Sequence, residues 1–209
     1  MNTQFQRAKS KENKKIRLQQ IMDVTDHLFE THSYHEITLS TISAETGLAR
    51  GGLYKYVSSK EEIFLSIYAQ KEKAFNEEAV RRLSEEKLTH ESFAQILAES
   101  AYDHLDYIKY HQILNAIIES NVSVEKLAQY KKESAQYHQP LFEYIGVYLS
   151  LDPSQVFDFY LTVLYHCVYL YDRVAYSDRY VEAMKLAELN IEEIDFIDNL
   201  KEFILKLIK

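Results

Sequence analysis

The chain has little cysteine, proline or glycine, and each scarcity excludes a class of structure. Its 209 residues include one Cys, two Pro and four Gly. A single thiol, Cys167, cannot form an internal disulfide, which excludes disulfide-stabilised secreted scaffolds. Few helix breakers and no regular alternation of strands and turns favour an all-α protein over a sandwich or barrel.

Long apolar runs are also absent. In the C-terminal half, the longest stretch without a charged residue is Phe159–Tyr171, whereas a membrane-spanning helix needs about 20 apolar residues. The N-terminus is polar and basic and has no apolar signal-peptide core. We therefore expect a cytoplasmic protein that does not interact with membranes.

Motifs of enzymes are missing as well. There is no His-Glu-x-x-His, no Glu-x-x-His pair, no Gly-rich phosphate loop and no nucleophile elbow. His104 and His111 are seven residues apart and could share a helix face, with Glu119, His138 and His166 elsewhere. Histidines without ligand spacing are more often surface or hydrogen-bonded core groups than ligands. We expect no catalytic residue, no metal and no cofactor.

The net charge of −8 is unevenly distributed. Residues 1–60 carry nine Lys and Arg against six Asp and Glu, and the remainder is strongly acidic. A basic end on an acidic body suits a protein that presents one face to phosphates. The alternative is an unevenly charged, solvated surface, and the charge alone favours DNA only weakly.

Residues 33–64 contain the pattern of a helix-turn-helix followed by a capped fourth helix. A short helical run containing Ile42 is broken at Gly47, and a second short run with Leu53 follows Arg50. Two short helices joined by a Gly-containing turn form the unit that places its second helix in the DNA major groove. Ser59 and Glu62 have the spacing of a capping box.

The segment from Thr46 to Glu62 resembles the N-terminal signature of the TetR family, in which a Gly-containing turn precedes Leu-Tyr-x-Tyr-Phe and Ser-Lys-Glu. The resemblance covers about residues 14–68. It implies a three-helix DNA-binding domain at 1–60 and a helical effector-binding and dimerisation domain at 61–209. Residues 1–13 are polar and basic and are expected to form a mobile arm, which could follow phosphates, reach the minor groove or remain a solvated tail. The resemblance also implies these DNA-facing positions: Thr38, Arg50, Gly52, Tyr54, Lys55, Tyr56 and Lys60. Of these, Arg50 is the best candidate for base readout, because guanidinium pairs bidentately with guanine.

The chain departs from the family pattern in the recognition helix, expected at Arg50–Tyr56. Ala49 stands where Ser or Thr usually caps the helix, which removes a cap worth about 1 kcal/mol. Gly51 and Gly52 each cost roughly 1 kcal/mol relative to Ala. Either this helix becomes ordered only on DNA, or close backbone approach replaces side-chain contact. Val57 replaces the usual Phe, which we interpret as a packing change.

Apolar periodicity and caps predict the remaining helices. The first helix should run from Lys14 to Thr31, and Thr38 should cap the second. The fourth should begin at Ser59 and continue to about Leu83. Asp152-Pro153 marks a helix start, while residues 176–190 could be helix or loop. The later helices are expected near 90–109, 111–120, 123–149, 153–175 and 193–208. The last two are apolar on more than one side, which fits the family's pairing of such helices in a homodimer.

The body is rich in aromatic residues, which suit a small-molecule pocket between helices. An aromatic-rich core is the alternative for each residue. Acidic groups such as Asp103, Asp106 and Glu119 would favour a cationic, planar effector. The candidate pocket residues are Tyr102, Asp103, Tyr107, His111, Glu119, Tyr137, Phe142 and Tyr160.

These observations favour a ligand-responsive repressor that binds a palindromic double-stranded DNA operator as a homodimer and responds to an unknown small-molecule effector. A second hypothesis keeps the fold but treats the helix-turn-helix as degenerate. The chain would then be a ligand-binding or protein-interaction module without a specific operator. An α-helical enzyme would need a catalytic constellation that the sequence lacks. The effector, the operator and the sign of regulation do not follow from the sequence.

Overall fold

The computed structural model describes residues 2–85 and 87–208, with side chains from residue 12 onward, and this part of the chain contains helices and turns but no strand. The all-α prediction is therefore confirmed. Two compact units form: unit 1 comprises residues 1–70 and 113–130, and unit 2 comprises residues 71–112 and 131–209. The units divide the fourth helix after Gln70, whereas the sequence places the domain boundary at residue 60.

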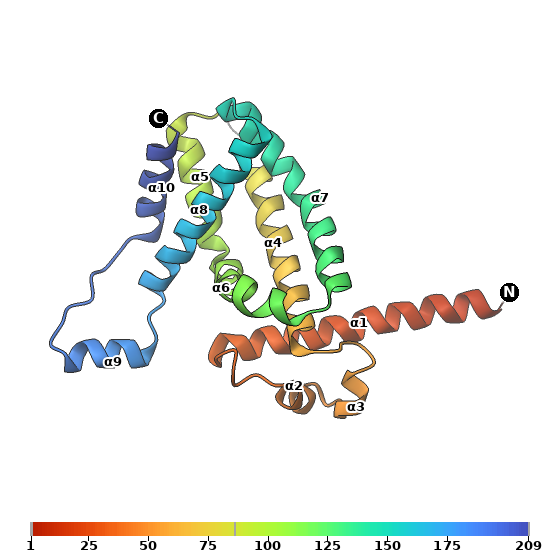
Figure 1. Cartoon of the computed structure of the whole chain (residues 1–209). Coiled ribbons are helices and arrows are strands. Elements are labelled where there is room, and N and C mark those ends of the chain that lie inside the picture. The colour runs from red at the N-terminus through yellow and green to blue at the C-terminus, as the bar shows by residue number, and fades with distance from the viewer. Residues whose placement is uncertain (1, 86, 209) are drawn as a thin grey trace. The chain divides into compact units, whose positions relative to one another are not determined.

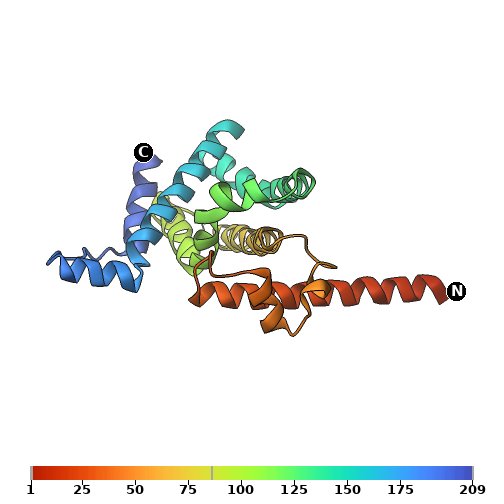
Figure 2. The same ribbon diagram turned by 60° about the horizontal axis from the view of Figure 1, so that its bottom comes forward.

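Unit 1 is built from α1 (Asn2–Thr31), α2 (Leu39–Thr46), α3 (Arg50–Leu53) and the first part of α4 (Lys60–Ser84). Helix α2 packs on α1, and α3 packs on α2 (Figure 2). Ile42 and Leu53 are fully buried, together with Ile21 and Phe64. The short π-helix η1 (Leu114–Ile118), the turn η2 (Glu119–Asn121) and the start of α7 (Val124–Leu149) complete the unit.

The caps of unit 1 follow the sequence closely. The Thr38 hydroxyl accepts from the Thr41 amide, and Gly47 ends α2 with a left-handed φ of 66°. Ser59 accepts from the Glu62 amide at 3.3 Å, while the Glu62 carboxylate accepts from the Ser58 amide at 2.9 Å. The reciprocal bond of the predicted box thus reaches one residue further back than expected.

Two expectations for unit 1 are wrong. Helix α1 begins at Asn2 rather than Lys14, so residues 2–13 continue the helix instead of forming a mobile arm. That segment has no Pro or Gly and is rich in Lys, Arg, Gln and Glu, which propagate helix well. Helix α3 ends at Leu53 and a turn follows it, so the second helix is shorter than the predicted Arg50–Tyr56.

Unit 2 contains the rest of α4 and α7 and most of the C-terminal helices. These are α5 (His90–Asp103), α6 (Leu105–Ile113), α8 (Pro153–Val174), α9 (Asp178–Leu186) and α10 (Phe196–Leu207). Helix α10 lies against α5 and α8 (Figure 1). The predicted cap at Asp152 forms, because its carboxylate accepts from the amides of Ser154 and Gln155.

The remaining predicted helices differ from the structure in two places. The helix expected at 90–109 breaks at His104, and the one expected at 111–120 is divided among α6, η1 and η2. Residues 176–190, which the sequence left open, contain α9, and this helix buries none of its residues. Among the described residues, no helix is long and apolar enough to span a bilayer.

Candidate DNA-binding and effector sites

The residues expected to face DNA all belong to unit 1. Arg50, Tyr54 and Lys55 are exposed, and Tyr54 retains 49% of its accessible surface. They follow directly after the turn at Gly47, while Leu53 anchors α3 in the core. The sequence thus places cationic and phenolic groups outward from a fixed apolar residue, and such groups bind phosphates and base edges.

Helix α3 is the weak element of this face. Its four residues begin after Ala49, which makes no side-chain cap bond. Gly51 and Gly52 have open space where a Cβ would stand, so no close packing within the described chain requires either glycine. Tyr56 is half-buried and Thr38 is exposed, with its hydroxyl engaged in the α2 cap.

Lys60 is oriented differently from the other six residues. Its ammonium donates to the carbonyl oxygens of Tyr34 at 2.8 Å and Ile37 at 2.7 Å, and lies 3.7 Å from the centre of the Tyr34 ring. Partial burial lowers the pKa of Lys60 from its ordinary value, against an opposing effect of Glu61. Two of the three ammonium protons therefore tie the turn after α1 to the start of α4, which favours a structural role over phosphate binding.

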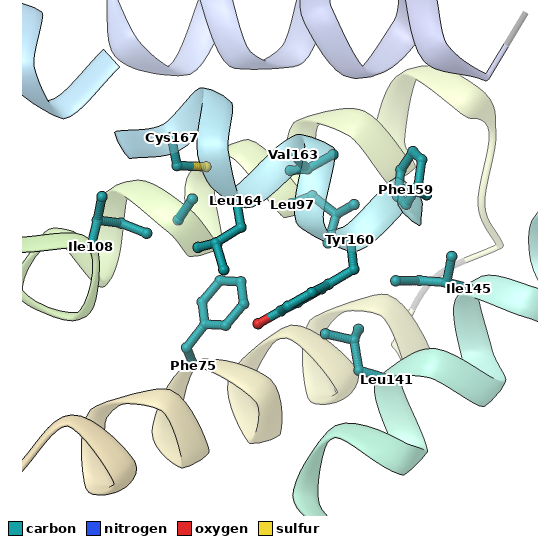
Figure 3. Close-up of a pocket in the computed structure, with 11 residues that line it drawn as sticks. Phe75, Leu97, Ile108, Leu141, Ile145, Phe159, Tyr160, Val163, Leu164 and Cys167 are labelled. Carbon is teal, nitrogen blue, oxygen red and sulfur yellow. The ribbon is translucent and has the colours of Figure 1, made fainter. Parts of the chain in front are cut away.

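A small apolar cavity, the inner cavity, lies in unit 2. Its volume is about 30 Å³, which is room for no more than a few water molecules. Figure 3 shows the Phe75 ring from α4 and the Tyr160 ring from α8 facing the same space. Side chains from four helices line the rest of the cavity: Leu97, Ala101, Ile108, Leu141, Ile145, Phe159, Val163, Leu164 and Cys167.

A buried cluster of hydrogen-bonding groups, the polar cluster, borders the inner cavity through Tyr160. The Glu72 carboxylate accepts from the hydroxyls of Tyr137 at 2.8 Å and Ser134 at 3.2 Å. His138 Nε2 lies 3.6 Å from Glu72 Oε1 and 3.0 Å from the Tyr160 hydroxyl. Satisfying a buried carboxylate in this way is what allows it to remain in the core.

The direction of the bonds in the polar cluster follows from its acceptors. His138 Nδ1 lies 2.8 Å from the Ser134 carbonyl oxygen, which can only accept, so Nδ1 carries a proton. With Nδ1 protonated, Nε2 is the ring atom able to accept from the Tyr160 hydroxyl. Burial, and then the charge of Glu72, raise the pKa values of Tyr160 and Tyr137. Both phenols are therefore protonated donors at neutral pH.

The eight predicted pocket residues are only partly brought together. Tyr160 lines the inner cavity, Tyr107 lies 3.2 Å from its hydroxyl, and Tyr137 and Phe142 pack around His138. His111 is buried beside Tyr107. Tyr102 is 47% exposed, and Asp103 bonds Arg82 at the surface. Glu119 belongs to unit 1.

Sequence reasoning missed most of the residues that line the inner cavity, because they are aliphatic side chains on ordinary apolar helix faces. It also missed Glu72, whose burial within a charged stretch of α4 has no local signal. Of the acidic groups expected to attract a cation, Asp103 is paired with Arg82 and Asp106 with Lys71, each at 2.5 Å. That pairing removes the main argument for a cationic effector.

The Cys167 thiol is buried in the wall of the inner cavity. Burial raises the pKa of the Cys167 thiol to about 12, so the group is protonated and a poor nucleophile. Within residues 2–85 and 87–208, no group of three or more His, Cys, Asp or Glu side chains is placed to hold a metal ion.

Two family models match successive parts of the chain. Residues 21–67 match the family model described as bacterial regulatory proteins, tetR family, and residues 69–209 match the tetracyclin repressor-like C-terminal domain. A curated relative is the fatty acid metabolism regulator protein of Bacillus subtilis, strain 168, which is 27% identical over 86 residues. That match covers 41% of this chain and only 44% of the relative.

Solved structures share the fold at low sequence identity. The fatty acid degradation regulator FadR from Bacillus halodurans has a TM-score of 0.59 and 18% identity, with 92% of this chain and 94% of that chain covered. FadR from Bacillus subtilis, solved in complex with stearoyl-CoA, has a TM-score of 0.51 and 17% identity, covering 91% and 96%. A TetR/AcrR regulator from Thermobifida fusca has a TM-score of 0.55 and 19% identity, covering 92% and 96%.

The C-terminal family model alone spans more than half of the chain, and the N-terminal model covers the capped helix-turn-helix described above. Regulators of this family bind DNA and are not enzymes. The chain belongs to the TetR family of transcriptional regulators.

Proposed function

We propose that the chain is a ligand-responsive repressor that binds a palindromic operator as a homodimer and is released by a long-chain acyl-CoA. The observation that carries operator reading is the exposed group of Arg50, Tyr54 and Lys55 held beside a capped α2. The two α3 helices of such a dimer, about 34–36 Å apart, would enter successive major grooves on one face of the duplex.

Support for an acyl effector comes from two directions. The lining of the inner cavity is almost entirely apolar and suits a hydrocarbon chain in its chemistry, although a volume of about 30 Å³ requires side chains to move before a chain can enter. Two similar proteins are named as fatty acid regulators, and a third match, FadR from Bacillus subtilis, was solved with stearoyl-CoA. Release from DNA requires that the ligand bind more tightly to a conformation with low operator affinity.

Selection of bound sequences from a random DNA pool at near-physiological salt tests operator reading. An enriched palindrome then serves as the probe for release by stearoyl-CoA. Replacing Arg50 by Ala should cost about 1–3 kcal/mol and relax specificity at one base position. Arg179→Ala, at an exposed site on α9, is the matched control and should leave the selected sequence unchanged.

A second candidate, the degenerate module without a specific operator, draws on the short α3 with its two glycines and missing cap. Such a protein would enrich no sequence and would bind DNA only with steep salt dependence. An enriched palindrome whose Arg50→Ala variant loses discrimination at one position would exclude it.

A further inference from the structure

An open groove, the α4–α7 groove, lies on the surface of unit 2 with a volume of about 590 Å³. Side chains of α4 and α7 line it, among them Asn76 and Tyr137. Both residues contact the polar cluster: Tyr137 donates to Glu72, and Asn76 interacts with the Tyr160 hydroxyl. The groove and the inner cavity are therefore separated by one layer of side chains.

Asn76 is the incompletely satisfied member of that layer. It retains 1% of its accessible surface, and its Nδ2 donates to the Glu72 carbonyl oxygen at 2.8 Å. That carbonyl can only accept, which fixes the orientation of the amide. Its Oδ1 is buried with no hydrogen-bond partner among the described residues. Buried acceptors without a partner are rare and costly, and each calls for an explanation.

The surroundings restrict what could donate to Asn76 Oδ1. Glu72 is buried next to it, and Glu77 and Glu133 line the groove, where Lys73 already pairs with Glu77 at 3.6 Å. An anionic group placed here would meet carboxylates at close range in a low-dielectric setting. A neutral N–H donor meets no such penalty and completes the hydrogen bonding of Asn76.

On the other side of the layer, the inner cavity accepts only apolar groups. At about 30 Å³ it is too small for a hydrocarbon chain, so a chain that enters must displace the Tyr160 ring, which forms part of its wall (Figure 3). A ligand that fits both spaces has an apolar chain, then a short neutral connection with an N–H donor, and any charged head further out in solvent.

We propose that the α4–α7 groove and the inner cavity form one binding site for a neutral acyl thioester arm, with Asn76 as a specificity-determining residue. This inference rests on the proposed function. In an acyl-CoA the first amide N–H follows closely after the thioester, and the phosphates lie much further along. The acyl chain enters behind Tyr160, and that N–H donates to Asn76 Oδ1. A free fatty acid places its carboxylate against Glu72 instead and binds poorly.

A matched pair of ligands tests this assignment on the full-length protein. The first is the thioester of lauric acid with N-acetylcysteamine, which has one amide N–H and no phosphate. The second replaces that N–H by an ester oxygen. Isothermal titration should show fivefold to tenfold tighter binding of the amide, the range expected for one hydrogen bond. Laurate should bind at least tenfold more weakly than either thioester.

The variant Asn76→Leu keeps side-chain volume and removes the acceptor. It should bind the two thioesters equally while its thermal unfolding stays at or above that of the wild type. The control Gln139→Leu, at an exposed position of α7 outside the groove lining, should keep the preference for the amide. Equal binding of amide and ester by the wild type overturns the role of Asn76 but leaves an acyl effector in place. No binding of any acyl thioester, lauroyl-CoA included, overturns the proposed effector itself. If Asn76→Leu does not fold, the comparison of the amide and ester ligands on the wild-type protein alone decides whether the site accepts an N–H donor.

Discussion

Among single residues, Lys60 shows how a DNA-facing position of a family can take on a structural task. Its two bonds to the Tyr34 and Ile37 carbonyl oxygens join segments far apart in the sequence. Lys60→Met leaves both carbonyls without a charged donor. We expect the free energy of unfolding to fall by about 2 kcal/mol, measured by urea denaturation followed by circular dichroism.

Lys55→Met is the matched control, because Lys55 is exposed. It should leave stability within about 0.5 kcal/mol of the wild type and weaken operator binding instead. If Lys60→Met unfolds at the same urea concentration as Lys55→Met, the two carbonyl bonds contribute nothing measurable to the free energy of unfolding. Lys60 would then again be a candidate for phosphate binding.

His111 makes stability depend on pH. Burial, and then the charge of Lys131, lower its pKa from 6.5 to about 4 in the folded chain. The unfolded chain takes up a proton near pH 6.5 and the folded chain does not, so stability is lost as the pH falls from about 6.5 to 4 and the loss levels off below that. The expected loss is on the order of 3 kcal/mol.

Unfolding curves recorded at pH 7, 5.5 and 4.5 measure this dependence as the difference between the wild type and His111→Gln. The variant should show a shallower decline. His27→Gln, on an exposed part of α1, should decline as the wild type does. Parallel curves for the wild type and His111→Gln would mean that the folded chain accommodates the charged imidazole.

Among the helices, those with a local signal at their ends were predictable from the sequence. Thr38 and Gly47 delimit α2, and Asp152 followed by Pro153 starts α8. Each of these signals works through atoms within four residues of the helix end, so no tertiary information is needed.

The elements that sequence reasoning missed depend on contacts between distant residues. His104 ends α5 without a Pro or Gly nearby, where its ring meets Phe75 edge-on at 5.9 Å. Helix η1 has wider turns than an α-helix, and Leu114 and Ile118 at its ends are buried. Apolar periodicity runs through both places unchanged, which is why it predicted continuous helices there.

Helix α3 offers a direct test of its two glycines. Neither has a left-handed φ, and a Cβ at either meets nothing within 4 Å. Gly51→Ala and Gly52→Ala should therefore each raise the free energy of unfolding by up to about 1 kcal/mol. Because position 52 faces DNA by family resemblance, we expect only Gly52→Ala to lower operator affinity, measured by fluorescence anisotropy. Tighter binding by Gly52→Ala would favour a helix that becomes ordered on DNA.

For the molecule as a whole, the proposed DNA-binding residues are easier to predict from the sequence than the proposed effector-binding residues. The residues expected to face DNA all lie within the short segment 38–60, so sequence spacing alone was enough to select them. The inner cavity is lined by side chains from five helices. The sequence predicts pocket residues mainly from their aromatic character. That choice selected Tyr160 and the exposed Tyr102 alike, because burial is decided by tertiary packing and not by residue type.

The predicted homodimer can be tested by mutating exposed side chains on α8 and α10. Tyr165 and Tyr169 on α8 and Leu207 on α10 are large apolar or aromatic side chains that retain 52%, 49% and 42% of their surface in the single chain. Burying them against a second copy would account for the apolar character of both helices. The double variant Tyr169→Glu and Leu207→Glu places two charges there, which a solvated monomer tolerates and a buried interface does not.

We expect this variant to sediment as a monomer with an unchanged circular dichroism spectrum. Its operator affinity should fall at least about a hundredfold, because two half-sites are no longer bound together. Val147→Glu, on α7 with 83% of its surface exposed, adds a charge away from these helices and should remain dimeric. A double variant that stays a dimer would assign the interface to other surfaces, of which α9, with no buried residue of its own, would be the next to mutate.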